Sequence, residues 1–304
     1  MSAAGGRAGG ALDAPHRRAR RRRAPVGLVF ILPSALVIAV VVVWPIIATT
    51  YLGFTDYSMF GAPEWTGLDN LTRLVQDPDV RRAVWITVLY TVISVPLQTV
   101  LAMLLADILA RRFRNRLGSW ARSILFIPVM ASLVLTGTVW RYLLAYDGPV
   151  NQVLGWFGVP QTDWLGDSSW VVVVIALVTA WKNIGYFLVI YYAGIMDVPG
   201  DVYEAAALDG AGPWHLFWRI TLPILRPVTL LVVILGTIWS FQVFDLVYTM
   251  TNGGPGGAST TLVYLIYQAA FKSFKMGYAS ALSVVLFLAI LVISIVQRRA
   301  LREG

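Results

Sequence analysis

The sequence contains no cysteine and only two histidines, His16 and His215, among its 304 residues. The absence of cysteine excludes disulfide bonds and thiolate metal sites, and two isolated histidines lack the spacing of metal ligands. Charged residues are also scarce, at 13%, against about a quarter in an average soluble domain. Apolar residues make up 58% of the chain, and this composition indicates a membrane protein.

Long apolar runs with few charges recur along the chain. A helix needs about 20 apolar residues to cross a hydrocarbon layer roughly 30 Å thick. A transmembrane barrel is disfavoured, because runs such as VIAVVVVWPII do not alternate in polarity. The sequence therefore predicts an all-α integral membrane fold with six transmembrane helices, at approximately residues 26–51, 83–110, 124–146, 170–196, 228–250 and 279–297.

The formal charge of +8 follows the membrane segments, so no nucleic-acid partner is expected. Most arginines fall on one side of the predicted spans, and the positive-inside rule then places both termini in the cytoplasm of a cell membrane, inner or plasma. Residues 1–24 predict a disordered basic cytoplasmic tail that is drawn to anionic membrane lipid. A cleavable secretion signal is the alternative, but the apolar run from Val26 exceeds its usual core of roughly 7–15 residues.

Residues 25–300 are expected to form the transmembrane domain. On its outer side, the periodic residues Leu68, Leu71, Leu74 and Val75 predict a short surface helix. The apolar residues 262–271 predict a helix that is too short to span and dips into the outer leaflet.

The cytoplasmic segment 197–223 has an unusual pattern for a loop between spans, and we call it the coupling segment. A first helix is expected to begin near Pro199 or Asp201 and to end at Gly210, which suits a left-handed helix cap. A second helix is expected from Pro213 to about Ile220, with Pro223 ending it.

The composition of this segment favours docking to another protein. An ordinary inner loop or an amphipathic helix on the inner leaflet would be basic, whereas this segment is acidic. The run of alanines from Ala205 leaves one helix face flat, and Trp214, Phe217 and Trp218 supply bulky anchors. Its acidic residues are Asp197, Asp201, Glu204 and Asp209.

The coupling segment resembles the EAA loop of ABC importer permeases, EAA-x3-G-x9-I-x-LP. The matching residues are Glu204, Ala205, Ala206, Gly210, Ile220, Leu222 and Pro223. The sequences NGGP at 252–255, GYASALS at 277–283 and GLDN at 67–70 are similar to those of binding-protein-dependent sugar permeases of the maltose and glycerol-phosphate type. The resemblance covers roughly residues 25–300.

The resemblance implies a division of labour between subunits. It implies a second permease subunit in a heterodimer, two copies of an ABC ATPase, and an extracytoplasmic solute-binding protein that delivers a sugar. The EAA loop would enter a cleft on the ATPase, where Glu204 pairs with a basic residue and Gly210 allows the turn. No G-x-x-x-x-G-K-[ST] phosphate loop occurs in the sequence, so ATP and Mg²⁺ are expected on the ATPase chains. This chain is expected to be no enzyme and to carry no cofactor or metal.

Polar residues inside the spans are candidates for the substrate pathway. Lys182, Asn183, Gln242 and Asp245 lie near mid-span among aromatic residues, and amide, carboxylate and aromatic groups suit a sugar. The resemblance implies pathway roles for the residues at corresponding positions in the two spans that flank the coupling segment, namely Asn183, Tyr186, Gly236, Trp239, Ser240 and Val243.

Other interpretations of the same residues remain. Lys182 and Asp245 could form a buried ion pair between helices, and Tyr186 and Trp239 could serve packing alone. A self-contained secondary transporter is the alternative function. Such proteins usually show paired broken helices or inverted repeats with coupled charges, and the sequence offers one such charge pair. An exporter fits poorly, because the EAA loop belongs to importers.

Overall fold

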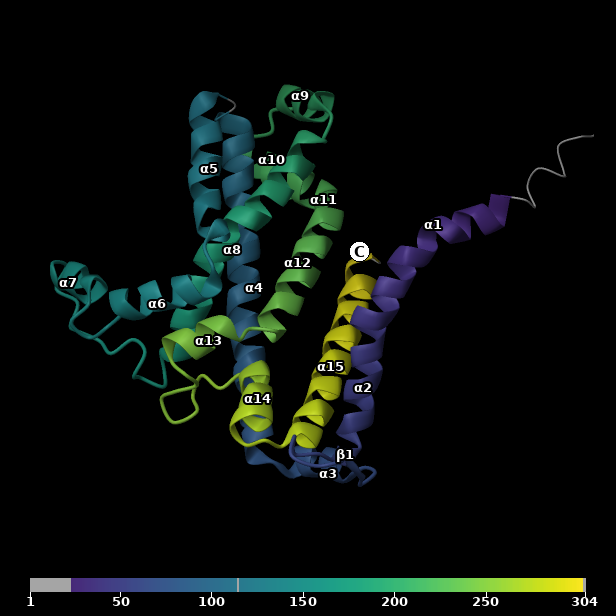
Figure 1. Cartoon of the computed structure of the whole chain (residues 1–304). Coiled ribbons are helices and arrows are strands. Elements are labelled where there is room, and N and C mark those ends of the chain that lie inside the picture. Colours follow the sequence, from purple (N-terminus) through teal and green to yellow (C-terminus); the bar gives the residue numbers. More distant parts are fainter. Residues whose placement is uncertain (1–22, 114, 303–304) are drawn as a thin grey trace, which may run out of the picture. The chain divides into compact units, whose positions relative to one another are not determined.

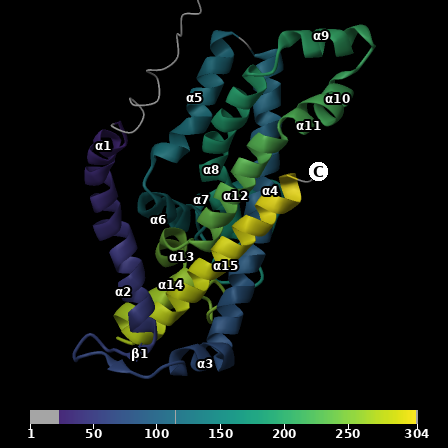
Figure 2. The same ribbon diagram turned by 90° about the vertical axis from the view of Figure 1, so that its right-hand side faces the viewer.

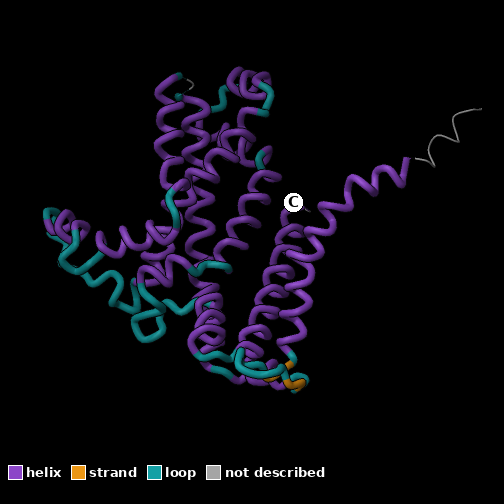
Figure 3. The backbone as a smooth tube through the Cα atoms, viewed as in Figure 1, coloured by secondary structure: helices purple, strands orange, loops and turns teal. Residues whose placement is uncertain are grey.

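The computed structural model describes residues 23–113 and 115–302. The predicted disordered tail lies outside the described residues, except for Arg23 and Ala24, which begin α1. Helices make up most of the described chain, which confirms the predicted all-α class (Figures 1 and 3). In chain order the elements are α1 (Arg23–Ile38), η1 (Ala39–Val43), α2 (Trp44–Gly53), β1 (Thr55–Asp56), β2 (Glu64–Trp65), α3 (Asp69–Gln76), α4 (Pro78–Arg112), α5 (Arg116–Met130), α6 (Leu133–Leu143), α7 (Pro149–Gly155), α8 (Val171–Met196), α9 (Gly200–Leu208), α10 (Pro213–Leu216), η2 (Phe217–Thr221), α11 (Leu222–Ile224), α12 (Arg226–Phe241), α13 (Asp245–Met250), α14 (Leu262–Tyr267), η3 (Gln268–Lys272) and α15 (Met276–Arg302).

The chain divides into two compact units, Met1–Tyr51 and Leu52–Gly304. In the described part of the first unit, α1, the π-helical turn η1 and α2 follow one another without a break. The stretch Phe30–Gly53 has 24 residues and is apolar enough to cross a membrane, as predicted for the first span.

In the second unit, α4 lies beside α8 over much of its length (Figures 1 and 2). The small buried residues Ala102 and Ala106 on α4 let the two helices approach closely, as is usual where helices associate in a membrane. The hydroxyl of Tyr90 on α4 also donates a hydrogen bond of 2.7 Å to Oγ1 of Thr179 on α8. This helix pair is the support on which the shorter elements pack.

The predicted third span, residues 124–146, is interrupted. Helix α5 ends at Met130, Ala131 and Ser132 have extended backbone, and α6 leaves at 97° to α5. Ser132 caps the new helix, because its Oγ accepts a hydrogen bond from the amide of Leu135. The sequence analysis did not predict this bend, which lies inside the apolar run at the cap that starts the second helix.

The predicted fifth span, residues 228–250, is also interrupted. Helix α12 ends at Phe241, three residues follow without helical structure, and Asp245 begins α13. The short helices α6 and α13 pack on each other (Figure 1), and Gly137 lies directly against the side chain of Thr249. Two short helices, each from the second part of a predicted span, thus meet at this point.

Among the described residues, four helices are long and apolar enough to span a membrane. The number rises to six if each of two bent helix pairs counts as one span, namely Arg116–Met130 with Leu133–Leu143 and Trp214–Ile224 with Arg226–Phe241. The other three long helices are Pro78–Arg112, Val171–Met196 and Met276–Ala300. The predicted surface helix is present as α3, and the predicted short apolar helix is present as α14 continued by η3.

Candidate functional site

A cavity of about 530 Å³ lies between α8, the break that follows α12, and the break between α5 and α6. This volume falls in the range of small-molecule sites in proteins. The cavity brings together eight of the nine residues predicted for the substrate pathway, which are Lys182, Asn183, Tyr186, Trp239, Ser240, Gln242, Val243 and Asp245. Their role in binding stays a prediction.

Gly236 is the predicted pathway residue that does not line this cavity. It is buried on the α12 face toward α4, where an added Cβ atom would lie 2.6 Å from Nε2 of Gln98. The glycine therefore allows close packing of these two helices. One turn later, Ser240 faces the cavity and shares a hydrogen bond of 3.0 Å with Ser94 of α4.

The polar cavity groups are held by neighbouring side chains. Nδ2 of Asn183 donates to Oε1 of Gln98 over 3.3 Å, which ties the α8 wall to α4. The aromatic groups also contact one another, since the ring centroids of Tyr186 and Trp239 are 5.1 Å apart. The wall therefore offers an amide, a carboxylate and two aromatic rings at one place.

Lys182 does not pair with Asp245, so the ion pair that was the alternative to a substrate role is absent from the described residues. Its Nζ donates three hydrogen bonds to backbone carbonyls at the end of α5, at 3.0 Å to Pro128, 3.2 Å to Val129 and 2.7 Å to Ala131. These carbonyls are at the C-terminus of a helix, where the helix dipole favours a positive charge. The ammonium therefore stabilises the break between α5 and α6.

Gly185, one turn further along α8, supports the same contact between α8 and α5. An added Cβ atom there would meet the backbone of Leu125 and Phe126, so α5 lies directly against α8 at this point. The position of the break thus depends on a glycine and a lysine on one face of α8.

Sequence reasoning missed several residues that line the cavity. Tyr90 and Thr179 come from the α4–α8 pair, and Val129, Ala131 and Leu133 come from the broken third span. The signal that could have located the break was Pro128 followed four residues later by a serine cap. No sequence signal pointed to Tyr90.

The coupling segment has the predicted form of helix, glycine turn and helix. Helix α9 ends at Leu208, Gly210 has φ +77°, and the amide of Ala211 donates to the carbonyl of Ala206. This is the Schellman arrangement, in which a glycine takes the left-handed position after the helix. The second helix begins at Pro213 as predicted.

Pro223 does not end the second helix, contrary to the prediction. The π-helical turn η2 is followed directly by α11, so Pro223 lies inside a continuous helical stretch and removes one backbone hydrogen bond without ending it. The helix ends at Ile224 instead, and α12 continues at 72° to it.

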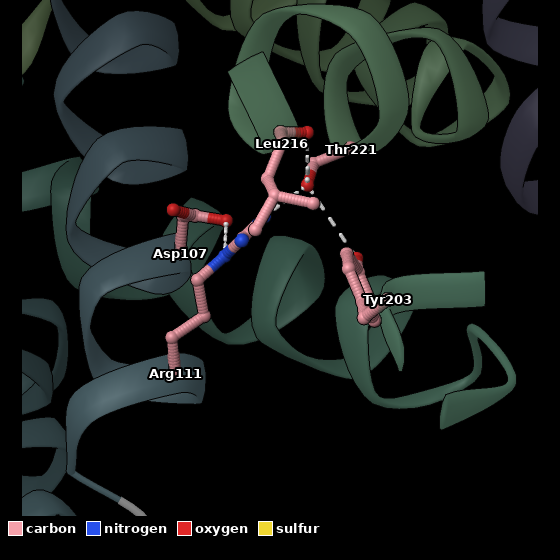
Figure 4. A network of polar contacts seen from close by, with 5 residues as sticks. All are labelled: Asp107, Arg111, Tyr203, Leu216 and Thr221. Carbon is pink, nitrogen blue, oxygen red and sulfur yellow. Dashed lines mark hydrogen bonds and ion pairs between the residues drawn. The ribbon is translucent and has the colours of Figure 1, made fainter. Parts of the chain in front are cut away.

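Much of the coupling segment is exposed. Of the seven motif residues, Glu204, Ala205, Gly210 and Pro223 are exposed and the other three are half-buried. Two large apolar side chains beside them are also exposed, Leu208 at 89% and Trp214 at 71%. Arg111, at the end of α4, contacts both helices of the segment (Figure 4).

Comparison with known proteins shows the family to which this chain belongs. Residues 80–302 match the family described as "Binding-protein-dependent transport system inner membrane component". The chain is 33% identical to the sulfoquinovosyl glycerol transport system permease protein SmoG of Agrobacterium fabrum, over 91% of this chain and 90% of that protein. It is 32% identical to the trehalose/maltose transport system permease protein MalF of Thermococcus litoralis, over 90% of this chain and 93% of that protein.

The fold is similar to that of a chain in a bacterial alginate ABC transporter, solved in complex with an alginate pentasaccharide-bound periplasmic protein. The TM-score is 0.82, with 21% identity, over 95% of this chain and 98% of that one. The family match and the sequence relatives agree with the resemblance that the EAA motif of the coupling segment indicated. This multi-pass membrane protein therefore belongs to the family of binding-protein-dependent transport system inner membrane components, the permease subunits of ABC transporters.

Proposed function

We propose that this permease subunit carries a sugar or sugar-like solute into the cell by alternating access, driven by separate ATPase subunits. The observation that carries this proposal is the cavity formed by Asn183, Tyr186, Trp239 and Asp245. A sugar presents hydroxyl groups that hydrogen-bond to amides and carboxylates and a C–H face that packs on aromatic rings. Relatives named for sulfoquinovosyl glycerol and for trehalose and maltose support the same solute class.

The cavity walls suit a site that changes its access. The wall on one side is α8, which packs on α4, and the opposite wall is formed by the interrupted backbone at residues 242–244. Irregular backbone at membrane depth is tolerated where it lines a cavity. Small changes at the two breaks would open the site toward one side of the membrane and close it toward the other.

The proposed partners are a second permease subunit, two copies of an ABC ATPase and an extracytoplasmic solute-binding protein. The coupling segment, cytoplasmic in this proposal, would dock on an ATPase through Glu204 and the exposed Leu208 and Trp214. ATP and Mg²⁺ would be bound by the ATPase chains, which perform the hydrolysis. This chain itself acts as the pathway and not as an enzyme.

The test is uptake of radiolabelled disaccharides and glycosyl glycerols by proteoliposomes that contain the complete transporter. We expect uptake that requires ATP and that continues when a protonophore collapses the proton gradient. Trp239→Ala should raise the solute concentration for half-maximal uptake by about fivefold or more, because loss of aromatic stacking removes roughly 1 kcal/mol or more of binding free energy. Trp120→Ala, at an exposed position on α5, is the matched control. It should leave the solute concentration for half-maximal uptake unchanged. Uptake by this chain alone, without an ATPase, would show a secondary transporter instead.

A further inference from the structure

The end of α4 is joined to the coupling segment by one arginine. Nε of Arg111 donates to Oδ1 of Asp107 over 2.6 Å, and its Nη2 donates to Oγ1 of Thr221. Its guanidinium also lies over the ring of Tyr203, 4.9 Å from the ring centroid. Figure 4 shows these side chains meeting between α4, α9 and the turn η2.

The partners of Arg111 are shielded from water. Thr221 is fully buried, and the side chains of Arg111 and Asp107 are only 22% and 13% exposed. Charge-assisted hydrogen bonds in such surroundings are stronger than ion pairs on the surface. The arginine is therefore held firmly, whereas its neighbour Arg112 is exposed.

Thr221 is the point where the contacts converge. Its hydroxyl donates its single proton to the carbonyl of Leu216 over 3.2 Å, so it accepts from Arg111. The hydroxyl of Tyr203 lies 3.5 Å away and must then be the donor in that contact. Both helices of the coupling segment, α9 through Tyr203 and η2 through Thr221, are thus attached to one guanidinium.

The other end of this connection reaches the cavity. Arg111 belongs to the same unbroken helix as Gln98, which accepts a hydrogen bond from the cavity residue Asn183. The two positions are about 20 Å apart along α4 at 1.5 Å per residue. A displacement of the coupling segment would therefore be carried by a rigid helix to the wall of the cavity.

We propose that Arg111 is a positioning residue that makes the coupling segment and α4 move as one body, and so links ATP hydrolysis to solute movement. This inference rests on the proposed function, in which an ATPase docks on the coupling segment. It assigns to Arg111, Thr221 and Tyr203 a role inside the permease, separate from the exposed residues that would contact the ATPase.

The test compares Arg111→Gln with Arg112→Gln in the complete transporter reconstituted in proteoliposomes. The measured quantity is the number of solute molecules taken up per ATP hydrolysed. We expect Arg111→Gln to keep the ATPase subunits bound and hydrolysing ATP, while this ratio falls by about tenfold. Arg112→Gln should keep the ratio of the unmodified transporter.

Three results would overturn the inference. An unchanged ratio in Arg111→Gln would show that the connection is not needed. A parallel loss of ATPase binding, hydrolysis and uptake would show that Arg111 serves assembly only. If Arg111→Gln fails to insert into the membrane, Thr221→Val is the second variant, because it removes the central hydroxyl with little change in shape. An unchanged ratio of solute taken up to ATP hydrolysed in Thr221→Val would also show that the connection is not needed. Failure of the unmodified transporter to show ATP-dependent uptake would instead overturn the proposed function, and the role of Arg111 with it.

Discussion

At the scale of single residues, Lys182 shows how a buried charge is accommodated in a membrane protein. It is 6% exposed and its three hydrogen bonds go to carbonyls at the end of a helix rather than to a carboxylate. Polar groups within spans are usually assigned to substrate binding. Here the geometry supports a structural task, although the residue also lines the cavity.

Replacing Lys182 with methionine should destabilise the protein. Carbonyls that now accept from a charged donor would lose their partner, and hydrogen bonds of this kind contribute about 1.5–3 kcal/mol each. Thermal unfolding in detergent should show a lower midpoint for Lys182→Met than for Lys275→Met, which is at an exposed position. Unchanged stability together with weaker solute binding would assign Lys182 to the solute instead.

Glu204 offers a second residue-scale prediction. It is exposed on α9, so reversing its charge should leave the fold intact and act on the partner alone. We expect Glu204→Lys to weaken ATPase docking by about 2–5 kcal/mol, the usual effect at a buried interfacial charge pair, and to abolish uptake. Co-purification of the ATPase measures the effect, and Asp201→Lys, exposed on the same helix outside the motif, is the control. Normal docking of Glu204→Lys would exclude the proposed contact.

At the scale of elements, the turn between α9 and α10 can be tested through its glycines. Both Gly210 and Gly212 have open space around them, but only Gly210 has a positive φ, at +77°. Gly210→Ala should therefore cost about 1–2 kcal/mol of backbone strain, while Gly212→Ala should not.

Hydrogen–deuterium exchange at the amide of Ala211 provides the measurement, because this amide bonds across the turn to Ala206. We expect exchange to accelerate by about 5- to 30-fold in Gly210→Ala, the population change that this strain implies. Equal protection in the two variants would mean that the turn does not depend on the left-handed glycine.

The broken spans show why hydropathy predicts some elements and not others. Apolar runs located every long helix, because burial in lipid depends on composition. The breaks after Met130 and Phe241 occur inside apolar runs, and the first one depends on the distant ammonium of Lys182 as well as on the local cap of Ser132. Broken helices, which secondary transporters usually show, are present here as well, and family membership decides between the two functions.

The two candidate sites show the same difference between features that local sequence determines and contacts between residues far apart in sequence. The helices and turn of the coupling segment followed from its glycine and proline positions, because those residues act locally. The contact between Arg111 and Thr221 joins residues on different helices, and nothing in the sequence pattern pairs them. Lys182, Asn183, Gln242 and Asp245 were predicted because polar residues are unusual within spans, and the family resemblance supplied the remaining cavity residues. Gly236, which also came from the resemblance, is explained by packing.

At the scale of the whole molecule, the absence of cysteine makes the membrane orientation directly testable. The coupling segment contacts the end of α4, and α3 directly precedes its beginning, so they lie at opposite ends of a helix about 50 Å long. Leu208 and Val75 are exposed at these two places. A single cysteine at Leu208 or at Val75 would therefore show, by its labelling, which side of the membrane that position faces.

With both termini in the cytoplasm, we expect a membrane-impermeant maleimide to label Val75→Cys in intact spheroplasts. Leu208→Cys should be labelled only after the membrane is permeabilised, because the coupling segment would face the interior. The unmodified chain has no thiol and is the background control. Labelling of Leu208→Cys in intact spheroplasts would invert the orientation and exclude an ATPase on that face.

The anchoring of the coupling segment by Arg111 also has a consequence for complex formation. Tyr203 and Thr221 are held within this chain alone, before any ATPase is present. In the proposed complex, an ATPase would meet a segment already held in one shape, so little conformational entropy would be lost by ordering it, and pre-organisation of this kind strengthens association. The transporter could therefore remain assembled through many cycles of nucleotide exchange.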